Sequence, residues 1–214
     1  MNSPATVDNT HQLRLIETKK KELVDKDYKR SYEARNDATG QLLAQCDSYE
    51  KSVSSICEII DHHGNQWEMQ PNRKVMPTRW LFKAPDGVKV FEIRLPNFLW
   101  MMINPLARTY LHLKDIRAQR SYRFIDLESS FGDRIFRSPV MAWSIMEKGR
   151  VVAKITRLTR EEEAPATKGF FAKLKQFFKG SDWALLTPGS EPLFDAPIFI
   201  GLMLIYEEVS NTPA

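Results

Sequence analysis

Apolar and polar residues alternate with a period of two through most of the chain. In residues 28–34, for example, Tyr32 and Ala34 share one parity while polar residues occupy the other. Because successive side chains of a strand point to opposite faces, this alternation predicts half-buried β-strands. Aromatic and β-branched residues, which strands favour, dominate these segments. The predicted strands are residues 28–34, 55–60, 66–69, 79–82, 88–93, 110–113, 122–125, 134–136, 143–146 and 151–155.

Turn-forming clusters separate the predicted strands. Residues 36–40, 61–65 and 85–87 each contain an Asp that can bond the local backbone and a Gly that tolerates a positive φ. Residues 147–149 end in a fourth Gly. Gly40, Gly64 and Gly87 are spaced 24 and 23 residues apart, about the length of one hairpin each. This even spacing predicts a meandering antiparallel sheet.

The C-terminal part of the chain breaks the β pattern. Residues 193–209 follow Pro192 and are apolar nearly all round until Glu207 and Glu208. A helix of that composition needs burial on every side. The segment is longer than a usual strand of about 5–6 residues, which favours a helix. A strand is the competing assignment, because Ile and Phe also favour strands.

This order of elements resembles the tubby C-terminal-like fold, the superfamily that includes the phospholipid scramblases and the LURP-one-related proteins. The resemblance is carried by the hairpins at 59–67, 83–87 and 143–155 and by the apolar segment 195–208, and it spans residues 13–209. It implies a mainly β fold, a closed antiparallel β-barrel of about twelve strands around a hydrophobic C-terminal helix. A plain up-and-down barrel and a two-sheet sandwich are the alternative folds.

We therefore expect a single tubby-like domain over residues 13–209, with residues 1–12 and 210–214 as flexible ends. Within it, residues 193–209 are expected to form the core helix, and residues 164–181 an amphipathic insertion with a short surface helix. A single large domain is compatible with 214 residues, of which 43% are hydrophobic.

The formal net charge of +4 is concentrated in one place. Four lysines between residues 168 and 179 lie in a stretch without acidic residues, so the rest of the chain is formally neutral. A local charge of this kind argues against a nucleic-acid-binding face. Residues 1–10 lack the apolar core of a signal peptide, and two cysteines are too few for a disulfide framework, so we expect a cytoplasmic protein. The apolar runs 98–107 and 196–206 are interrupted or too short for a transmembrane span.

The same basic stretch is the main candidate for a binding site. Its five apolar residues fall at helical spacing, and polar residues, mostly lysines, occupy the remaining surface. This pattern predicts a short amphipathic helix that binds an anionic membrane surface. The alternatives are that the apolar stripe packs on the barrel or that it meets a protein partner. The predicted membrane- or partner-binding residues are Lys168, Phe170, Phe171, Lys173, Leu174, Lys175, Phe177, Phe178 and Lys179.

Candidate chemistry elsewhere in the sequence is weak. His62 and His63 lie in a predicted turn, and no spacing supplies further metal ligands. Cys46 and Cys57 are not part of a CxxC motif, so buried, inert thiols are the favoured interpretation, and a nucleophile or a redox pair is the alternative. Acidic and basic residues interleaved between positions 115 and 137 predict a cross-strand ion-pair ladder and not a calcium site.

The sequence contains no recognisable catalytic, metal-binding or cofactor-binding motif. We therefore expect a non-enzymatic protein without a cofactor or metal, one that binds anionic phospholipid headgroups and associates peripherally with membranes. A protein-interaction or scaffold module that uses the Phe-rich segment is the alternative from a different class. Scramblase-like lipid handling is a further alternative, which rests on the resemblance alone.

Overall fold

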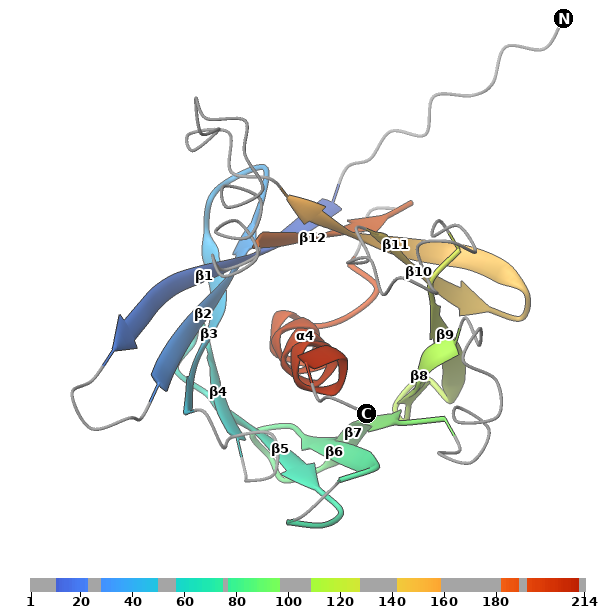
Figure 1. Ribbon diagram of the computed structural model, residues 1–214, viewed down its shortest axis with the longest axis horizontal. Coiled ribbons are helices and arrows are strands. Elements are labelled where there is room, and N and C mark those ends of the chain that lie inside the picture. Colours follow the sequence, from blue (N-terminus) through green and yellow to red (C-terminus); the bar gives the residue numbers. More distant parts are fainter. Residues whose placement is uncertain are drawn as a thin grey trace, which may run out of the picture.

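The described residues form a closed β-barrel with one helix inside it (Figure 1). The computed structural model describes residues 11–22, 28–49, 57–74, 77–96, 109–127, 142–158, 182–188 and 192–211. The elements are β1 (His11–Glu22), β2 (Tyr28–Asn36), β3 (Leu42–Tyr49), β4 (Cys57–Asp61), β5 (Gln66–Pro71), β6 (Arg79–Lys83), β7 (Lys89–Arg94), β8 (Thr109–Asp115), β9 (Arg120–Ile125), β10 (Ala142–Glu147), β11 (Arg150–Leu158), β12 (Asp182–Thr187) and α4 (Ala196–Asn211).

Each strand pairs antiparallel with its neighbours in sequence, and β1 pairs with β12 to close the barrel. At this seam Leu13 lies opposite Leu185 and Leu15 lies opposite Trp183. All four side chains are buried, so the seam is apolar on its inner side. Closure pairs both edges of the described sheet, and an unpaired edge is what makes open sheets prone to associate.

The inner face of the wall follows directly from the alternation in the sequence. In β6, Trp80 and Phe82 are buried and Arg79 is exposed. In β4, Cys57 and Ile59 are buried and Glu58 is exposed. Because side chains of a strand alternate between its two faces, the apolar set of these two strands points into the barrel and the polar set points to solvent.

Helix α4 lies inside the barrel, as the end-on view of Figure 1 shows. Phe199, Ile200, Leu202, Met203 and Ile205 are completely buried. These five residues face in different directions around the helix, which explains why its sequence is apolar on every side. The predicted fold is confirmed: a mainly β, closed antiparallel barrel with one hydrophobic C-terminal helix.

The helix begins at residue 196, three residues later than the apolar pattern predicts. The backbone carbonyl of Asp195 accepts the first hydrogen bonds of the helix, at 3.0 and 3.1 Å. Pro197 fits the first turn because the first backbone N–H groups of a helix have no partner within it. Phe194 precedes the helix but is also buried, with its ring edge-on to that of Phe91 at 5.2 Å. A residue that precedes the helix is therefore apolar because it is buried. For this reason the apolar run in the sequence begins before the helix does.

Gly201 marks the closest approach of α4 to the barrel wall. A Cβ atom at this position would lie 2.4 Å from both Cε1 and Cζ of Phe82 and 3.2 Å from Sδ of Met69. The first distance is far below the about 3.5–4.0 Å of a favourable carbon–carbon contact. Only a hydrogen atom fits between the helix backbone and β6 at this point.

The four predicted hairpin turns are present, each with its glycine at positive φ. In the turn after β4, Oδ1 of Asp61 accepts hydrogen bonds from the backbone N–H groups of His63 and Asn65, both at 2.9 Å. Oδ2 of the same carboxylate accepts from Nε1 of Trp67 at 3.2 Å. His62 and His63 are both exposed in this turn, as expected for solvated turn residues.

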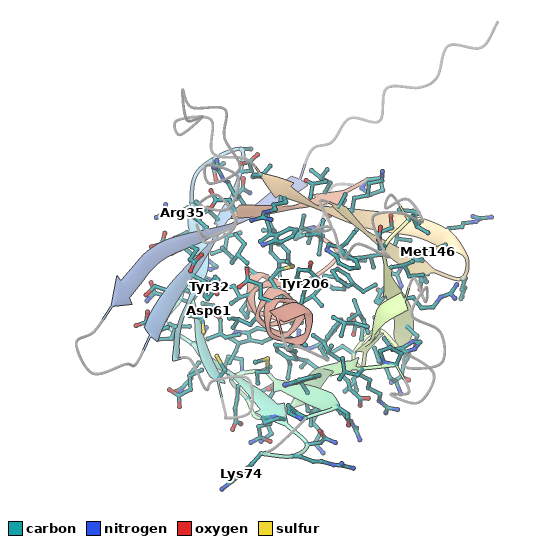
Figure 2. The ribbon with its side chains drawn as sticks, in the orientation of Figure 1. Tyr32, Arg35, Asp61, Lys74, Met146 and Tyr206 are labelled. Atoms are coloured by element: carbon teal, nitrogen blue, oxygen red, sulfur yellow. The ribbon has the colours of Figure 1, made fainter. Side chains whose placement is uncertain are left out.

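Polar contacts inside the barrel also hold the helix. Figure 2 shows Tyr32 and Tyr206 inside the ring of strands, whereas Lys74 extends away from it. The hydroxyl of Tyr32 donates to Oε2 of Glu207 at 2.9 Å and so joins β2 to α4. The ring of Tyr206 lies 4.9 Å from that of Trp143, which adds an aromatic contact with β10.

Three strands are not identified by the sequence pattern. β12 is buried at five of its six positions and so shows no alternation. β1 contains three consecutive lysines, Lys19 to Lys21, and the sequence pattern does not separate β3 from the turns around it. The predicted strand 134–136, the insertion 164–181 with its surface helix, and residues 1–10 and 212–214 lie outside the described residues.

Candidate functional site

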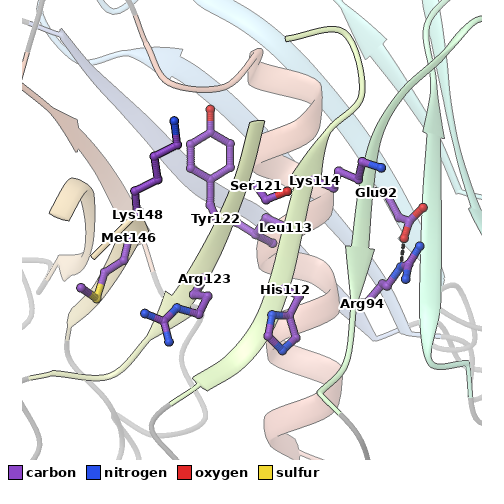
Figure 3. A pocket seen from close by; sticks show the side chains of 10 residues that line it. All are labelled: Glu92, Arg94, His112, Leu113, Lys114, Ser121, Tyr122, Arg123, Met146 and Lys148. Carbon is purple, nitrogen blue, oxygen red and sulfur yellow. Dashed lines mark ion pairs between the residues drawn. The ribbon is translucent and has the colours of Figure 1, made fainter. Parts of the chain in front are cut away.

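A pocket of about 300 Å³ lies on the outer face of the barrel, over β7, β8, β9 and β10 (Figure 3). Basic side chains dominate its lining, with two arginines, two lysines, one histidine and one carboxylate. The charged and polar residues that line it are Glu92, Arg94, His112, Lys114, Ser121, Tyr122, Arg123 and Lys148. Met146 contributes an apolar edge.

The strand register brings the first row of these side chains together. Arg94 pairs with His112 across β7 and β8, and His112 pairs with Arg123 across β8 and β9. Neighbouring strands are about 4.8 Å apart, so the three side chains stand side by side. Ile93 and Leu113, the adjacent residues in sequence, are buried in the interior. Alternation therefore directs the basic row outward.

A second row lies two residues further along the same strands. Glu92 pairs with Lys114, and Lys114 pairs with Ser121. Lys148 joins the pocket from the turn between β10 and β11, where it has φ 47° and Gly149 has φ 84°. Positive φ at both central residues is the geometry of a type I′ turn, whose twist matches that of the flanking strands. The tight turn thus carries Lys148 to the rim of the pocket.

Among the described residues, most of the positive charge in the pocket has no neutralising partner. The carboxylate of Glu92 is nearly buried and is shared by Arg79, at 2.6 Å, and Arg94. Within the part of the chain that the structure describes, Lys114, Arg123 and Lys148 form no ion pair. Other cations of the barrel wall do, and the pairs include Arg14 with Asp182, Arg35 with Glu33, and Lys83 with Glu68. Unpaired cations concentrated in one pocket are arranged to receive an anion.

His112 adds a titratable group at the centre of the basic row. Partial burial lowers its pKa below the ordinary histidine value, and the charges of Arg123 and Arg94 lower it further. Both effects disfavour the protonated imidazole while the pocket holds no counter-charge. A bound anion would oppose the arginine charges and raise this pKa again.

An ion pair borders the pocket on β9 and β10. The guanidinium of Arg120 donates two hydrogen bonds to the carboxylate of Glu147, and the one from Nε is 2.8 Å long. These hydrogen bonds lower the pKa of the Glu147 carboxyl. The same guanidinium lies 5.4 Å from the centre of the Tyr122 ring. Arg117 pairs with Asp195 at 3.3 Å. The predicted ladder within residues 115–137 is therefore wrong for these arginines, whose described partners come from other parts of the chain.

The two cysteines are buried, as the sequence predicts. The structure adds a feature that no spacing rule indicates: Sγ of Cys46 and Sγ of Cys57 lie 3.2 Å apart. The side-chain contact between them lowers the pKa of Cys57, while the same contact and burial raise that of Cys46.

The predicted membrane- or partner-binding residues, Lys168 through Lys179, all lie outside the described residues, so their prediction is untested. The pocket is a different feature, and the sequence pattern does not reveal it. Alternation in residues 111–114 does place His112 and Lys114 on one face. The alternation does not show the strand register, which places Arg94 and Arg123 on either side of His112.

No protein-family model matches this chain, and neither a curated protein nor a solved structure matches it. Among the described residues, no helix is long and apolar enough to cross a membrane. Nor do the His, Cys, Asp and Glu side chains in those parts of the chain gather in a group of three or more that would hold a metal ion. The chemistry of the basic pocket is thus what indicates a function.

Proposed function

We propose that this protein binds anionic phosphate headgroups at a membrane surface through the pocket over β7–β10. The observation that carries the proposal is the cluster of Lys114, Arg123 and Lys148, which form no ion pair within the described residues. Cations in that state attract anions over a distance of about one Debye length, roughly 8 Å at physiological salt. A single concave site of about 300 Å³ suits one headgroup better than a polymer, which would need an extended basic track.

The donor set suits a phosphate group. The guanidinium of Arg123 offers two parallel N–H donors that match two phosphate oxygens, whereas Lys114 and Lys148 act as point charges. The hydroxyl of Ser121 supplies a neutral donor beside Lys114. Glu92 is already engaged by Arg79 and Arg94, so its negative charge repels an incoming anion less than a free carboxylate would.

The architecture supports a lipid as the source of that phosphate. A closed antiparallel barrel around an apolar C-terminal helix is the arrangement that the resemblance to the tubby C-terminal-like fold implies. We propose that the chain is a tubby-like protein of non-enzymatic type, in keeping with a binding pocket on the outer wall. The resemblance to this family supports lipid binding only by analogy. The physical basis of the proposal is the basic pocket.

Co-sedimentation with vesicles tests this function. Phosphatidylcholine vesicles with and without about 30 mol% phosphatidylglycerol separate charge-dependent from charge-independent binding. Each basic residue near an anionic surface contributes about 1 kcal/mol, so the double variant Arg123→Gln/Lys148→Gln should bind anionic vesicles about 30-fold more weakly. The matched control is Lys89→Gln/Arg150→Gln, which removes two exposed cations of β7 and β11 that do not line the pocket.

The control variant has the same net charge as the pocket variant, so the two differ only in where charge is lost. Equal loss of binding in both variants would mean that vesicles are attracted by the total positive charge of the protein surface. The pocket proposal would then be wrong. If the protein binds soluble glycerol 1-phosphate but no vesicles, its ligand is a soluble phosphate compound. That result would contradict the proposal that the protein binds a membrane surface.

The Phe-rich segment remains an independent prediction for the same membrane surface. Phe171→Ser/Phe178→Ser removes two aromatic side chains from the sequence stripe without changing its charge. If that segment inserts, this variant loses binding to anionic vesicles in addition to any loss caused by the pocket variant. Unchanged binding would exclude the segment and leave the pocket as the contact.

A further inference from the structure

The two cysteines of the chain meet inside the barrel although eleven positions separate them in sequence. Cys46 lies on β3 and Cys57 is the first residue of β4, and both side chains belong to the apolar core. The chain contains no other cysteine. A distance of 3.2 Å between the two sulfurs leaves about 1.2 Å to close before a disulfide of about 2.05 Å can form.

The strand pairing between β3 and β4 is short. The described ladder between β3 and β4 covers the three pairs from Ala44–Asp61 to Cys46–Ile59. Cys57 lies two residues beyond the last of these pairs and is held on its other side by pairing with Met69 of β5. The thiols therefore lie at the end of the β3–β4 ladder, where local opening breaks few hydrogen bonds. Such an opening admits a small oxidant to side chains that are otherwise buried.

We propose that Cys46 and Cys57 form a reversible disulfide that staples β3 to β4 when the protein meets a hydroperoxide such as hydrogen peroxide. This modification site is separate from the basic pocket and does not depend on the proposed function. Three observations carry it: the distance between the sulfurs, their position at the end of a strand ladder, and the absence of any other cysteine in the sequence.

The chemistry proceeds in two balanced steps. The thiolate of Cys57 attacks one oxygen of hydrogen peroxide, the O–O bond breaks, and the leaving hydroxide takes up the thiol proton to become water. The sulfenic acid on Cys57 then meets the thiol of Cys46, which attacks its sulfur and displaces hydroxide, and this leaves as water with the Cys46 proton. Two thiols are oxidised to one disulfide, and one peroxide is reduced to two waters.

The electrostatics of the pair fit this order of events. The contact with Cys46 lowers the pKa of Cys57, against the effect of burial, while the pKa of Cys46 is raised. Cys57 is thus the thiol that loses its proton first, and the thiolate is the reactive form. Cys46 is already in contact with it and serves as the resolving thiol.

The test uses the full-length protein and hydrogen peroxide, followed by maleimide labelling under denaturing conditions and intact mass measurement. The expected product is a monomer that has lost two hydrogen atoms, takes up no maleimide, and regains two labels after treatment with dithiothreitol. A peptide that joins Cys46 to Cys57 should appear in a non-reducing digest. The staple closes a short loop, so the oxidised protein should melt about 5–10 °C higher than the reduced protein.

The variant Cys46→Ser provides the control. Without a resolving thiol, Cys57 should stop at the sulfenic acid or proceed to further oxygen addition, and no intramolecular disulfide is formed. The proposal is overturned if wild-type protein keeps both thiols, gains oxygen on them without losing two hydrogen atoms, or forms only dimers linked between chains. A disulfide that leaves the melting temperature unchanged would overturn its role as a staple.

Discussion

Replacing Gly201 by alanine provides a direct test of the helix inside the barrel. The added methyl carbon would lie 2.4 Å from two atoms of the Phe82 ring. That ring is completely buried, and it packs edge-on against Phe91 with 6.3 Å between ring centres. Because the ring is enclosed, it can yield only by displacing its neighbours or the helix.

Two opposing effects set the magnitude. In an exposed helix interior, exchanging glycine for alanine stabilises a protein by about 1 kcal/mol, since alanine loses less backbone entropy. Forcing an extra methyl group into a packed core costs about 1–3 kcal/mol, and this contact is close enough for the upper part of that range. We therefore expect Gly201→Ala to lower the free energy of unfolding by about 1–2 kcal/mol. For a chain of this size, that corresponds to a fall in Tm of about 2–8 °C.

Urea unfolding followed by circular dichroism measures this change. A second variant, Phe82→Leu, lacks the outer ring atoms that the methyl group would meet, and the double variant combines both changes. If the two sites touch, the double variant should be more stable than the sum of the single effects predicts, by about 1 kcal/mol. An increase in stability for Gly201→Ala, with additive effects in the double variant, would refute the enclosed position of α4.

Three further predictions concern other parts of the barrel. Tyr32→Phe removes the hydrogen bond to Glu207 and should lower the unfolding free energy by about 1 kcal/mol in urea, whereas an unchanged value would contradict that contact. Asp182→Ala leaves the partly exposed Arg14 without its nearly buried partner and should cost about 2–3 kcal/mol in the same assay, and a cost near zero would argue against an ion pair at the seam. Binding to phosphatidylglycerol vesicles should strengthen as pH falls from about 7.5 to about 5.5. The lowered pKa of His112 keeps it neutral at the upper end, and a bound phosphodiester favours its protonated form, so His112→Gln should flatten this dependence.

The fold could be predicted largely from local patterns. The turn glycines and the period-two alternation define most of the hairpins, and the uninterrupted apolar stretch identifies α4 as a helix that must be enclosed. β12 lacks this alternation because five of its six residues are buried, so neither parity is polar. The sequence signal for a half-buried strand is absent where a strand is covered on its outer face as well.

The candidate site could not be predicted in the same way. Arg94, His112 and Arg123 are separated by 18 and 11 positions in sequence, and only the pairing of three strands sets them side by side. A change of register by one residue would turn each of them to the opposite face. The contact between Cys46 and Cys57 depends on pairing in the same way, since they are diagonal neighbours on two strands.

The pairing of β1 with β12 also has a consequence for how the protein is made. Arg14 and Asp182, which join across this seam, are 168 positions apart, and α4 follows β12 in the chain. Chains emerge from the ribosome with the N-terminal end first, so the earlier strands must wait with their apolar faces uncovered until the last strand and the helix have been synthesised. Contacts of such long sequence separation also slow folding. We therefore expect the nascent chain to rely on chaperones that shield apolar strands, and a premature stop before residue 196 to yield an insoluble product in place of a smaller domain.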